Sequence, residues 1–329
     1  MTRAYARVFF CSLVTQRGLC YITLMNRDEQ IREVKSATLL RFNQVWQRNF
    51  SRNRDAIQRN PGIIKLKNKF RDIPCIVVGA GPSLDKNIKY LKKACDKAVI
   101  LCCDAALKPL LSQGIVPNFV VVLDPQEEIA RFLSNVPQSR INLVVPTIVH
   151  PNILDLWKEG NILFFNKFAP DIPTLVEIQK MVPEVGTLTP GGTVLSVTYD
   201  LAFQAGCNPI IFVGQDLSYP KKNSHSHGSD AAGKGLKSMV ERQKDSIVLE
   251  TDINEQPIRT LKSMSVSKQW FSWAFTTWKR DNPVVVSNCS EAGILSEHCS
   301  LLTLSEAIYK FCNTKVNIPW ILKKALKRK

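Results

Sequence analysis

Short apolar runs alternate with longer amphipathic stretches over the middle of the chain. Each run is too apolar to turn one face to water, which is typical of a strand buried between helices. Alternation on this scale predicts an α/β fold, with a mostly parallel sheet and helices on both of its faces. The expected strands are 74–78, 98–102, 119–123, 142–146, 162–165 and 210–213, and the expected helices are 85–94, 105–113, 126–134, 151–158, 171–182 and 193–206.

The flanking segments have other patterns. Residues 1–34 are expected to be a non-native or disordered extension, because the first two dozen residues carry arginines and no acid. That composition fits a start codon assigned too far upstream, or else a transit peptide. Residues 35–70 have apolar positions at helical spacing and predict a helical N-terminal extension to a core at 71–230. A hairpin, a helix with an aromatic face and one more strand in 231–312 form a C-terminal appendix that completes the core, before a basic tail at 313–329.

The charge balance is strongly basic. The chain of 329 residues has 44 Lys and Arg against 28 Asp and Glu, a formal net charge of +16. This excess favours anionic partners such as nucleic acid, acidic lipid or phosphorylated small molecules. Much of it lies near the ends of the chain, where charge runs are usually solvated, so no specific nucleic-acid partner is expected. The tail 320–327 could make weak contact with an acidic membrane surface.

Neither a membrane span nor a disulfide framework is expected. No apolar run approaches the roughly 18 residues that a transmembrane helix needs. The ten cysteines include no C-x-x-C pair, and several of them lie in apolar runs where a thiol behaves as a small hydrophobe. A reduced cytoplasmic location without structural zinc is therefore the simplest prediction.

A glycine turn follows the first strand. In such sheets ligands bind outside the carboxyl ends of the strands, and an anion finds free N–H groups where the next helix begins. The turn lacks the third glycine of G-x-G-x-x-G and the Gly-Lys-Ser/Thr of a P-loop. Its glycines could instead serve only close packing of strand and helix. The candidate phosphate-binding residues of this turn are Gly79, Ala80, Gly81, Pro82 and Ser83.

Other strand ends carry further polar groups. Asp104 and Asp124 are candidates for nucleotide binding or simple helix caps, and Asp216 ends the strand at 210–213. A second glycine turn, Gly191-Gly-Thr193, could bind an anion or cap the following helix. In the polar loop 221–228, His225 and His227 suit acid/base work or phosphate contact, unless the loop is simply solvated and mobile.

Five segments in this order resemble the MptE-like domain family, which includes motility-associated factor (Maf) glycosyltransferases and archaeal 6-hydroxymethylpterin diphosphokinases. The resemblance covers roughly residues 40–312 and implies a Rossmann-like fold that handles a nucleotide or pyrophosphate. The segments are Gly79-Ala-Gly-Pro-Ser-Leu-Asp85, residues 114–125, Gly191-Gly-Thr-Val194, Gly214-Gln-Asp-Leu-Ser-Tyr219 and Asn288-Cys-Ser-Glu-Ala-Gly293.

The resemblance also implies roles. Gly79, Gly81, Pro82 and Ser83 would line the nucleotide phosphate near Asp124, Gly192 and Thr193 would complete the cradle, and Asp216 with Tyr219 would face the sugar or acceptor. Family members often have Thr-His-Ala where this chain has Ser224-His-Ser-His-Gly228, so both histidines stay candidates. The catalytic candidates are His225, His227, Asp216 and Glu291.

Two enzymatic branches follow from the resemblance. A glycosyltransferase would take a CMP-activated nonulosonic acid, of sialic or pseudaminic type, to a protein such as flagellin or to a glycan acceptor, and needs no metal. A diphosphokinase would move a pyrophosphoryl group from ATP with Mg²⁺ held by paired carboxylates. Because the chain lacks an Asp-x-Asp pair, the first branch is preferred, although Asp104, Asp124 and Asp216 could converge on a metal. A non-catalytic nucleotide or nucleic-acid binding protein is the third hypothesis.

Overall fold

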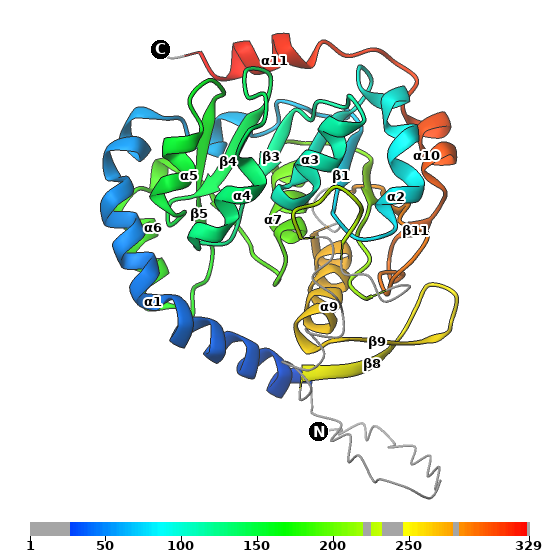
Figure 1. Ribbon diagram of the computed structural model, residues 1–329, viewed down its shortest axis with the longest axis horizontal. Helices are drawn as coiled ribbons and strands as arrows, with labels where there is room; N and C mark the ends of the chain where they lie inside the picture. The colour runs from blue at the N-terminus through cyan, green and yellow to red at the C-terminus, as the bar shows by residue number, and fades with distance from the viewer. Residues whose placement is uncertain (1–26, 220–224, 232–245, 279–282, 328–329) are drawn as a thin grey trace, which may run out of the picture.

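A parallel sheet forms the centre of the computed structural model, which describes residues 27–219, 225–231, 246–278 and 283–327. Nine strands of the described chain pair side by side in the order β11-β10-β7-β1-β2-β3-β4-β5-β6 (Figure 1). The predicted α/β fold is therefore confirmed. The strands are β1 Cys75–Val78, β2 Val99–Cys103, β3 Phe119–Val121, β4 Asn142–Pro146, β5 Ile162–Lys167, β6 Thr187–Leu188, β7 Ile210–Val213, β10 Val286–Asn288 and β11 Ser300–Leu301.

The central strands are buried on both faces. Every residue of β1, β2 and β7 is buried, as their continuous apolar runs predict. Cys75 at the start of β1 pairs with Val99 of β2 on one side and with Ile210 of β7 on the other. The chain runs from β1 outward to β6 and then returns to the opposite side of β1. The strand order therefore reverses between β1 and β7, the kind of position where doubly wound folds bind ligands.

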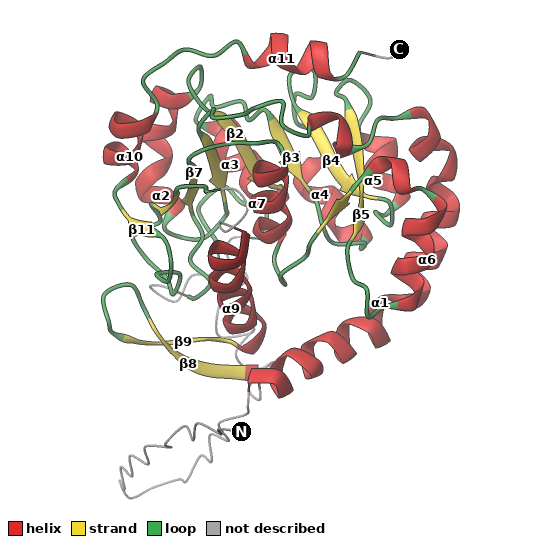
Figure 2. Ribbon diagram, turned by 180° about the vertical axis from the view of Figure 1, so that it is seen from behind, coloured by secondary structure: helices red, strands yellow, loops and turns green. Residues whose placement is uncertain are grey.

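Helices cover the two faces of this sheet. Helices α3 and α4 lie on one face, and Figure 2 shows α7 in front of the strands on the other. Helix α7 contacts β1, β2 and β3, so it covers the middle of the sheet. The helices between the strands are α3 Asp104–Ser112, α4 Ala130–Leu133, α5 Pro151–Leu156, α6 Pro173–Met181 and α7 Val194–Gln204, with the 3₁₀ turn η4 Pro183–Val185 before β6. A further 3₁₀ turn, η1 Ile63–Leu66, precedes β1.

Two expected helices are shorter than predicted. The stretch expected at 85–94 is a single α turn, α2 Leu84–Asn87, followed by the 3₁₀ segment η2 Ile88–Ala94. The stretch at 126–134 is the 3₁₀ turn η3 Glu127–Ile129 followed by α4. Periodicity cannot separate these cases, because 3₁₀ and α helices repeat at nearly the same spacing. A one-turn helix offers little dipole to an anion, so this expected source of phosphate affinity after β1 is weak.

Helix α1, Arg27–Arg59, runs along the side of the molecule from the hairpin to α5 and α6 (Figure 1). It begins eight residues before the predicted helical extension, and residues 1–26 lie outside the described chain. Two buried asparagines fasten it to the carboxyl end of the sheet. The Asn49 amide donates to the carbonyls of Pro125 and Ile148 at 2.9 and 3.1 Å. The Asn53 amide donates to those of Thr147 and Val149 at 3.1 and 2.8 Å.

The C-terminal appendix has the predicted parts. The hairpin of β8 Ile247–Thr251 and β9 Pro257–Leu261 is antiparallel and forms a small sheet of its own. Helix α9, Lys262–Thr277, packs on α7 through an aromatic cluster, in which Tyr199 stacks on Trp278 with centroids 5.5 Å apart and meets Phe275 edge-on at 5.1 Å. Strand β10 then joins the main sheet beside β7.

The last two helices of the described chain are α10 Leu304–Phe311 and α11 Ile318–Ala325. The segment before α11 is tied to the amino edge, because the Val316 N–H donates to the carbonyl of Asp96 just before β2 at 2.8 Å. Part of the predicted basic tail is thus a helix that buries Ile318 and Leu322 and exposes Trp320. No described helix is both long and apolar enough to cross a membrane.

We expect Asn53→Leu to lower the free energy of unfolding by about 2–4 kcal/mol, because two buried carbonyls would lose their donor. Urea denaturation followed by circular dichroism measures this loss. Gln47→Leu on the exposed side of the same helix is the control, with an expected change within about 0.5 kcal/mol. Equal stabilities of the two variants would show that the asparagine contacts do not hold α1 in place.

Candidate functional site

The turns that follow β1 and β7 are bound to each other where the strand order reverses. The Gly81 N–H donates to the carbonyl of Gly214 at 2.9 Å. A methyl group on Gly79 would lie 2.4 Å from the Gly214 oxygen, and one on Gly81 would lie 2.7 Å from the carboxylate of Asp216. Contact within the protein therefore accounts for both glycines, which matches the packing alternative that the sequence left open.

Asp216 fastens this junction. Its carboxylate accepts hydrogen bonds from the Ser83 N–H at 2.9 Å and from the Ser83 hydroxyl. Both side chains are buried. Burial raises the pKa of Asp216 to about 6, against the opposing effect of the Ser83 donors. Asp216 and Ser83, predicted to face the ligand, thus use their polar atoms on each other.

The turn at 288–293 packs against the same junction. The Ser290 hydroxyl accepts from the Gln215 N–H at 2.9 Å, and the Ile294 N–H donates to the carbonyl of Asp216 at 3.0 Å. A methyl group on Gly293 would lie only 2.0 Å from that carbonyl oxygen. Glu291 sits at the tip of this turn with a positive φ of 57° and a partly exposed side chain. The structure therefore brings three of the five recognised segments together.

A row of charged side chains follows the carboxyl edge from β2 to β5. We call Asp104, Asp124, Arg131 and Lys167 the charged row. Asp104 begins α3 directly after β2, and burial together with the negative charge of Asp124 raises its pKa to about 7, while Arg131 and the Ala105 N–H act in the opposite direction. At the other end, burial lowers the pKa of Lys167 to about 8, and Asp124 opposes this shift. The two acids thus stand between two cations.

Asp124 is held by its neighbours in a fixed orientation. The Gln126 N–H donates to Oδ1 at 2.9 Å, and the Gln126 amide donates to both carboxylate oxygens at 3.0 and 3.1 Å. Arg41 of α1 in turn donates to the Gln126 side-chain oxygen at 2.6 Å. Asp124 therefore caps its own turn, as the sequence allowed, while the side chain remains partly exposed beside Lys167.

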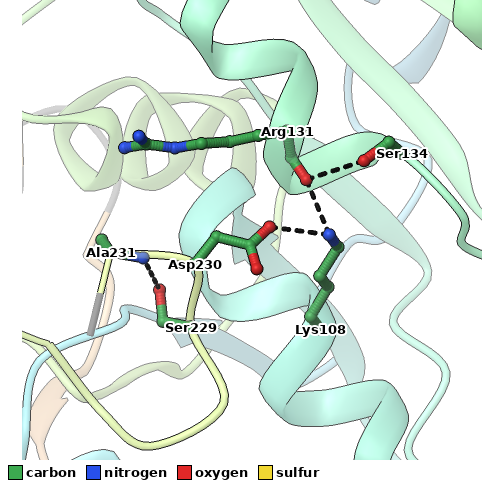
Figure 3. A network of polar contacts seen from close by, with 6 residues as sticks. All are labelled: Lys108, Arg131, Ser134, Ser229, Asp230 and Ala231. Atoms are coloured by element: carbon green, nitrogen blue, oxygen red, sulfur yellow. Dashed lines mark hydrogen bonds and ion pairs between the residues drawn. The ribbon is translucent and has the colours of Figure 1, made fainter. Parts of the chain in front are cut away.

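The segment 225–231 is anchored over this edge. Lys108 of α3 donates to Asp230 at 2.6 Å and to the carbonyl of Arg131 at 2.7 Å (Figure 3). The Ser226 N–H donates to the carbonyl of Ala80 at 2.9 Å. In Figure 3 the guanidinium of Arg131 points away from this network, and its buried Nε has no partner among the described residues. The segment 225–231, which includes the described part of the predicted loop, is thus held by α3 and by the turn after β1.

The two histidines have different surroundings. His225 is partly buried, and burial together with the nearby positive charge of Arg131 lowers its pKa. Its Nδ1 atom is buried without a partner in the described chain. His227 is exposed, and its ring Nδ1 lies 2.6 Å from Oδ2 of Asp85. The backbone N–H of His227 donates to Oδ1 of Asp85 at 2.9 Å. His225 therefore belongs with the charged row, and His227 with the outer surface.

The second glycine turn is shaped mainly by α9. A methyl group on Gly191 would lie 2.2 Å from the ring of Trp270, and Gly192, at a φ of 93°, contacts Ser267. The Gly191 N–H donates to the Ser196 hydroxyl at 2.6 Å. The Thr193 hydroxyl is buried without a partner in the part of the chain described, so it does not cap α7.

The hydroxyl of Tyr219 has a similar environment. It too is buried and lacks a partner among the described residues, and burial raises its pKa to about 12.

No three of the described His, Cys, Asp and Glu side chains gather in a group that could hold a metal ion. Asp104 and Asp124 are close enough to influence each other, whereas Asp216 faces Ser83 instead. The convergence of all three aspartates that the sequence left open does not occur. Two carboxylates still suit Mg²⁺, which commonly takes only one or two from the protein.

A surface hollow lies at the opposite, amino edge of the sheet. It is open to solvent, and its lining is mostly polar. The rule for doubly wound folds places ligands at the carboxyl ends, so this hollow is not the candidate site. Its lining is Asn68, Arg71, Asp72, Gly206, Asn208, Pro283 and Val284.

Sequence reasoning missed three residues of this region. Asp85 pairs with His227, Arg131 lies beside Asp104 and His225, and Lys167 ends β5. Arg131 falls in a polar helical stretch, where an arginine gives no sign of a functional role. Lys167 follows the apolar residues of its strand, and a lysine at the end of such a strand was the available sign of a site residue.

Comparison with known proteins shows the family of the chain. The model of the family described as 6-hydroxymethylpterin diphosphokinase MptE-like matches residues 48–222, which cover the charged row and the first four recognised segments up to Tyr219. The chain belongs to the MptE-like family. This confirms the resemblance seen in the sequence.

Individual relatives of this MptE-like protein are distant or short matches. An uncharacterized protein of Treponema pallidum (strain Nichols) is 36% identical over 86 residues, 26% of this chain and 40% of its own length. A second uncharacterized protein of that strain is 26% identical over 204 residues, 60% of this chain and 34% of its own length. The chain thus matches about two fifths or less of each relative.

A solved structure has the same fold. The Maf glycosyltransferase from Magnetospirillum magneticum AMB-1 superposes with a TM-score of 0.55 at 21% identity, over 80% of this chain and 40% of that one. At this identity the likeness shows the fold alone.

We expect Asp104→Asn to reduce the pH dependence of stability. Between the ordinary pKa of 3.8 and the folded value of about 7, the folded chain binds a proton at Asp104 that the unfolded chain does not. The free energy of unfolding therefore falls as pH rises through this window, on the order of 3 kcal/mol for this group. The asparagine side chain does not titrate and can still accept from the Ala105 N–H, so the variant should be the more stable protein above pH 7.

Urea denaturation at pH 5 and pH 7.5 measures how much the free energy of unfolding of each variant changes with pH. Asp155→Asn on the exposed side of α5 is the control and should follow the unaltered protein at both values. If Asp104→Asn shows the same change with pH as this control, Asp104 is ionised in the folded protein throughout the range.

Proposed function

We propose that this protein is a glycosyltransferase-like enzyme that uses a nucleotide-activated sugar, with a CMP-nonulosonic acid of sialic or pseudaminic type as donor. Membership of the MptE-like family and the shared fold with a Maf glycosyltransferase support this class. The observation that carries the proposal is His225, which lies at the carboxyl edge beside Arg131 with an unpartnered ring nitrogen. A protein or glycan hydroxyl would be the acceptor.

The chemistry assigns a role to each group. The acceptor oxygen attacks the anomeric carbon of the sugar, the bond from this carbon to the phosphate oxygen breaks, and CMP leaves with the bonding electrons. The proton of the hydroxyl passes to His225, whose lowered pKa keeps the ring neutral and able to accept it near pH 7. Arg131 faces the phosphate and stabilises the negative charge that grows there. The free hydroxyls of Thr193 and Tyr219 are the further contacts that we assign to the donor.

Pyrophosphoryl transfer from ATP is the second candidate, because Asp104 and Asp124 lie together. They would hold Mg²⁺, which neutralises phosphate charge when it is bound. Arg131 and Lys167 would then bind the remaining phosphate oxygens.

Binding measurements separate these candidates. We expect calorimetry to detect CMP and CMP-N-acetylneuraminate binding with or without Mg²⁺, and weaker binding of ATP. ATP binding that requires Mg²⁺, together with indifference to CMP, would establish the second candidate in place of the first. Binding of oligonucleotides alone would support the non-catalytic hypothesis.

Release of CMP from CMP-N-acetylneuraminate, with water in place of the acceptor, tests the base. We expect His225→Asn to reduce the rate about 10²- to 10⁴-fold, the range typical of lost general base catalysis. His227→Asn, two residues away on the exposed surface, is the matched control and should change the rate less than threefold or so. The reverse result would assign the base to the His227–Asp85 pair.

A further inference from the structure

Lys167 is a partly buried cation that no described residue pairs with through a hydrogen bond or an ion pair. It is the last residue of β5, and its side chain is partly buried at the carboxyl edge of the sheet. Its ammonium lies over the ring of Trp46, 5.2 Å from the centroid. Among the described residues it makes no hydrogen bond and no ion pair, although Asp124 is near enough to favour its charged form. Three other partly buried lysines, Lys108, Lys262 and Lys268, each pair with an acidic side chain.

An unpaired ammonium in such a place costs stability. Removing a charge from water is unfavourable unless hydrogen-bond acceptors replace the water, and the face of Trp46 replaces only part of it. Methionine at this position would contact Trp46 equally well without that cost. The interior packing therefore gives no reason for a lysine at 167, whereas a ligand would.

The position of Lys167 indicates which chemical groups its ligand carries. Lys167 ends β5, and Arg131 stands on α4 beside the end of β2, with Asp104 and Asp124 between them. The two acids repel an anion from the middle of the charged row, so two separate anionic groups can bind at its two ends. A ligand with a single phosphate would satisfy only one of them.

We propose that Lys167 binds a second anionic group of the donor, a carboxylate on the sugar, apart from the phosphate at Arg131. This proposal rests on the proposed function and names the residue that would recognise the acidic group of its donor sugar. The Lys167 ammonium donates to the carboxylate oxygens, and Trp46 behind it keeps the ammonium directed at the ligand. Neutral nucleotide sugars lack this group and are disfavoured.

Calorimetry with two probes tests the assignment. CMP carries only a phosphate, whereas CMP-N-acetylneuraminate carries a phosphate and a carboxylate. We expect Lys167→Met to weaken CMP-N-acetylneuraminate about 10- to 100-fold, the loss typical of a charged hydrogen bond, and to leave CMP within about twofold. Equal weakening of both probes would mean that Lys167 binds the phosphate instead and would overturn the carboxylate assignment. Lys167→Arg should keep most of the affinity.

Thermal unfolding of the same variants distinguishes a ligand contact from a structural one. If Lys167 serves the ligand, Lys167→Met should melt at the same temperature as the unaltered protein or higher. A lower melting temperature with unchanged affinity for both probes would assign Lys167 to packing on Trp46 and reject the proposal. Lys69→Met, at an exposed site before β1, is the control and should change neither quantity.

If the proposed function is wrong, the binding measurements will give a different set of results. If the unaltered protein binds Mg²⁺-ATP or pyrophosphate but neither CMP compound, the glycosyltransferase assignment fails, and Lys167→Met is then measured with pyrophosphate. A loss of pyrophosphate affinity would show an anion site without a sugar carboxylate and reject this substrate class. If the unaltered protein binds none of these probes, both proposals are rejected.

Discussion

The hydrogen bonds between Ser83 and Asp216 are the contact on which the carboxyl edge of this protein depends. They join the turns after β1 and β7 at the one point where the strand order reverses. Two glycines permit the approach, because a side chain at position 79 or 81 would overlap Gly214 or Asp216. The Asp216 carboxylate can stay buried because it accepts hydrogen bonds from Ser83, a residue of the turn that it holds in place.

This junction decides where chemistry can take place. A doubly wound sheet usually opens a crevice at the reversal point, but here the protein's own turns occupy it. Among the described residues, the basic side chains that have unpartnered atoms lie further along the edge and include Arg131, Lys167 and His225. They come from α4, β5 and the segment 225–231, and therefore from parts of the chain that only the fold brings near one another.

Two elements from outside the sheet hold that region in position. Helix α1 reaches the ends of β3 and β4 through Asn49 and Asn53, and it supplies the ring of Trp46 behind Lys167. From the other side, Lys108 joins the segment 225–231 to α3 and α4. Charged side chains can keep fixed places here because each neighbouring element is tied by buried or charge-assisted hydrogen bonds.

The sequence by itself determined the architecture and the family. Apolar runs such as Cys75–Val78 can be stable only between two layers of helices, so their spacing predicted the sheet. Five short segments in their order indicated the MptE-like family, whose model matches residues 48–222. Strand β11, of two residues, was not predicted, because two residues carry no periodic signal.

Only the tertiary structure decided which candidate residues are free to act. Sequence patterns treat Ser83, Asp216 and His225 alike, as polar residues at strand ends, but the first two bind each other and the third does not. Lys167 and Arg131 carried no motif at all. Whether a polar group has a partner depends on residues far away in the chain, and the local pattern contains no information about those distances.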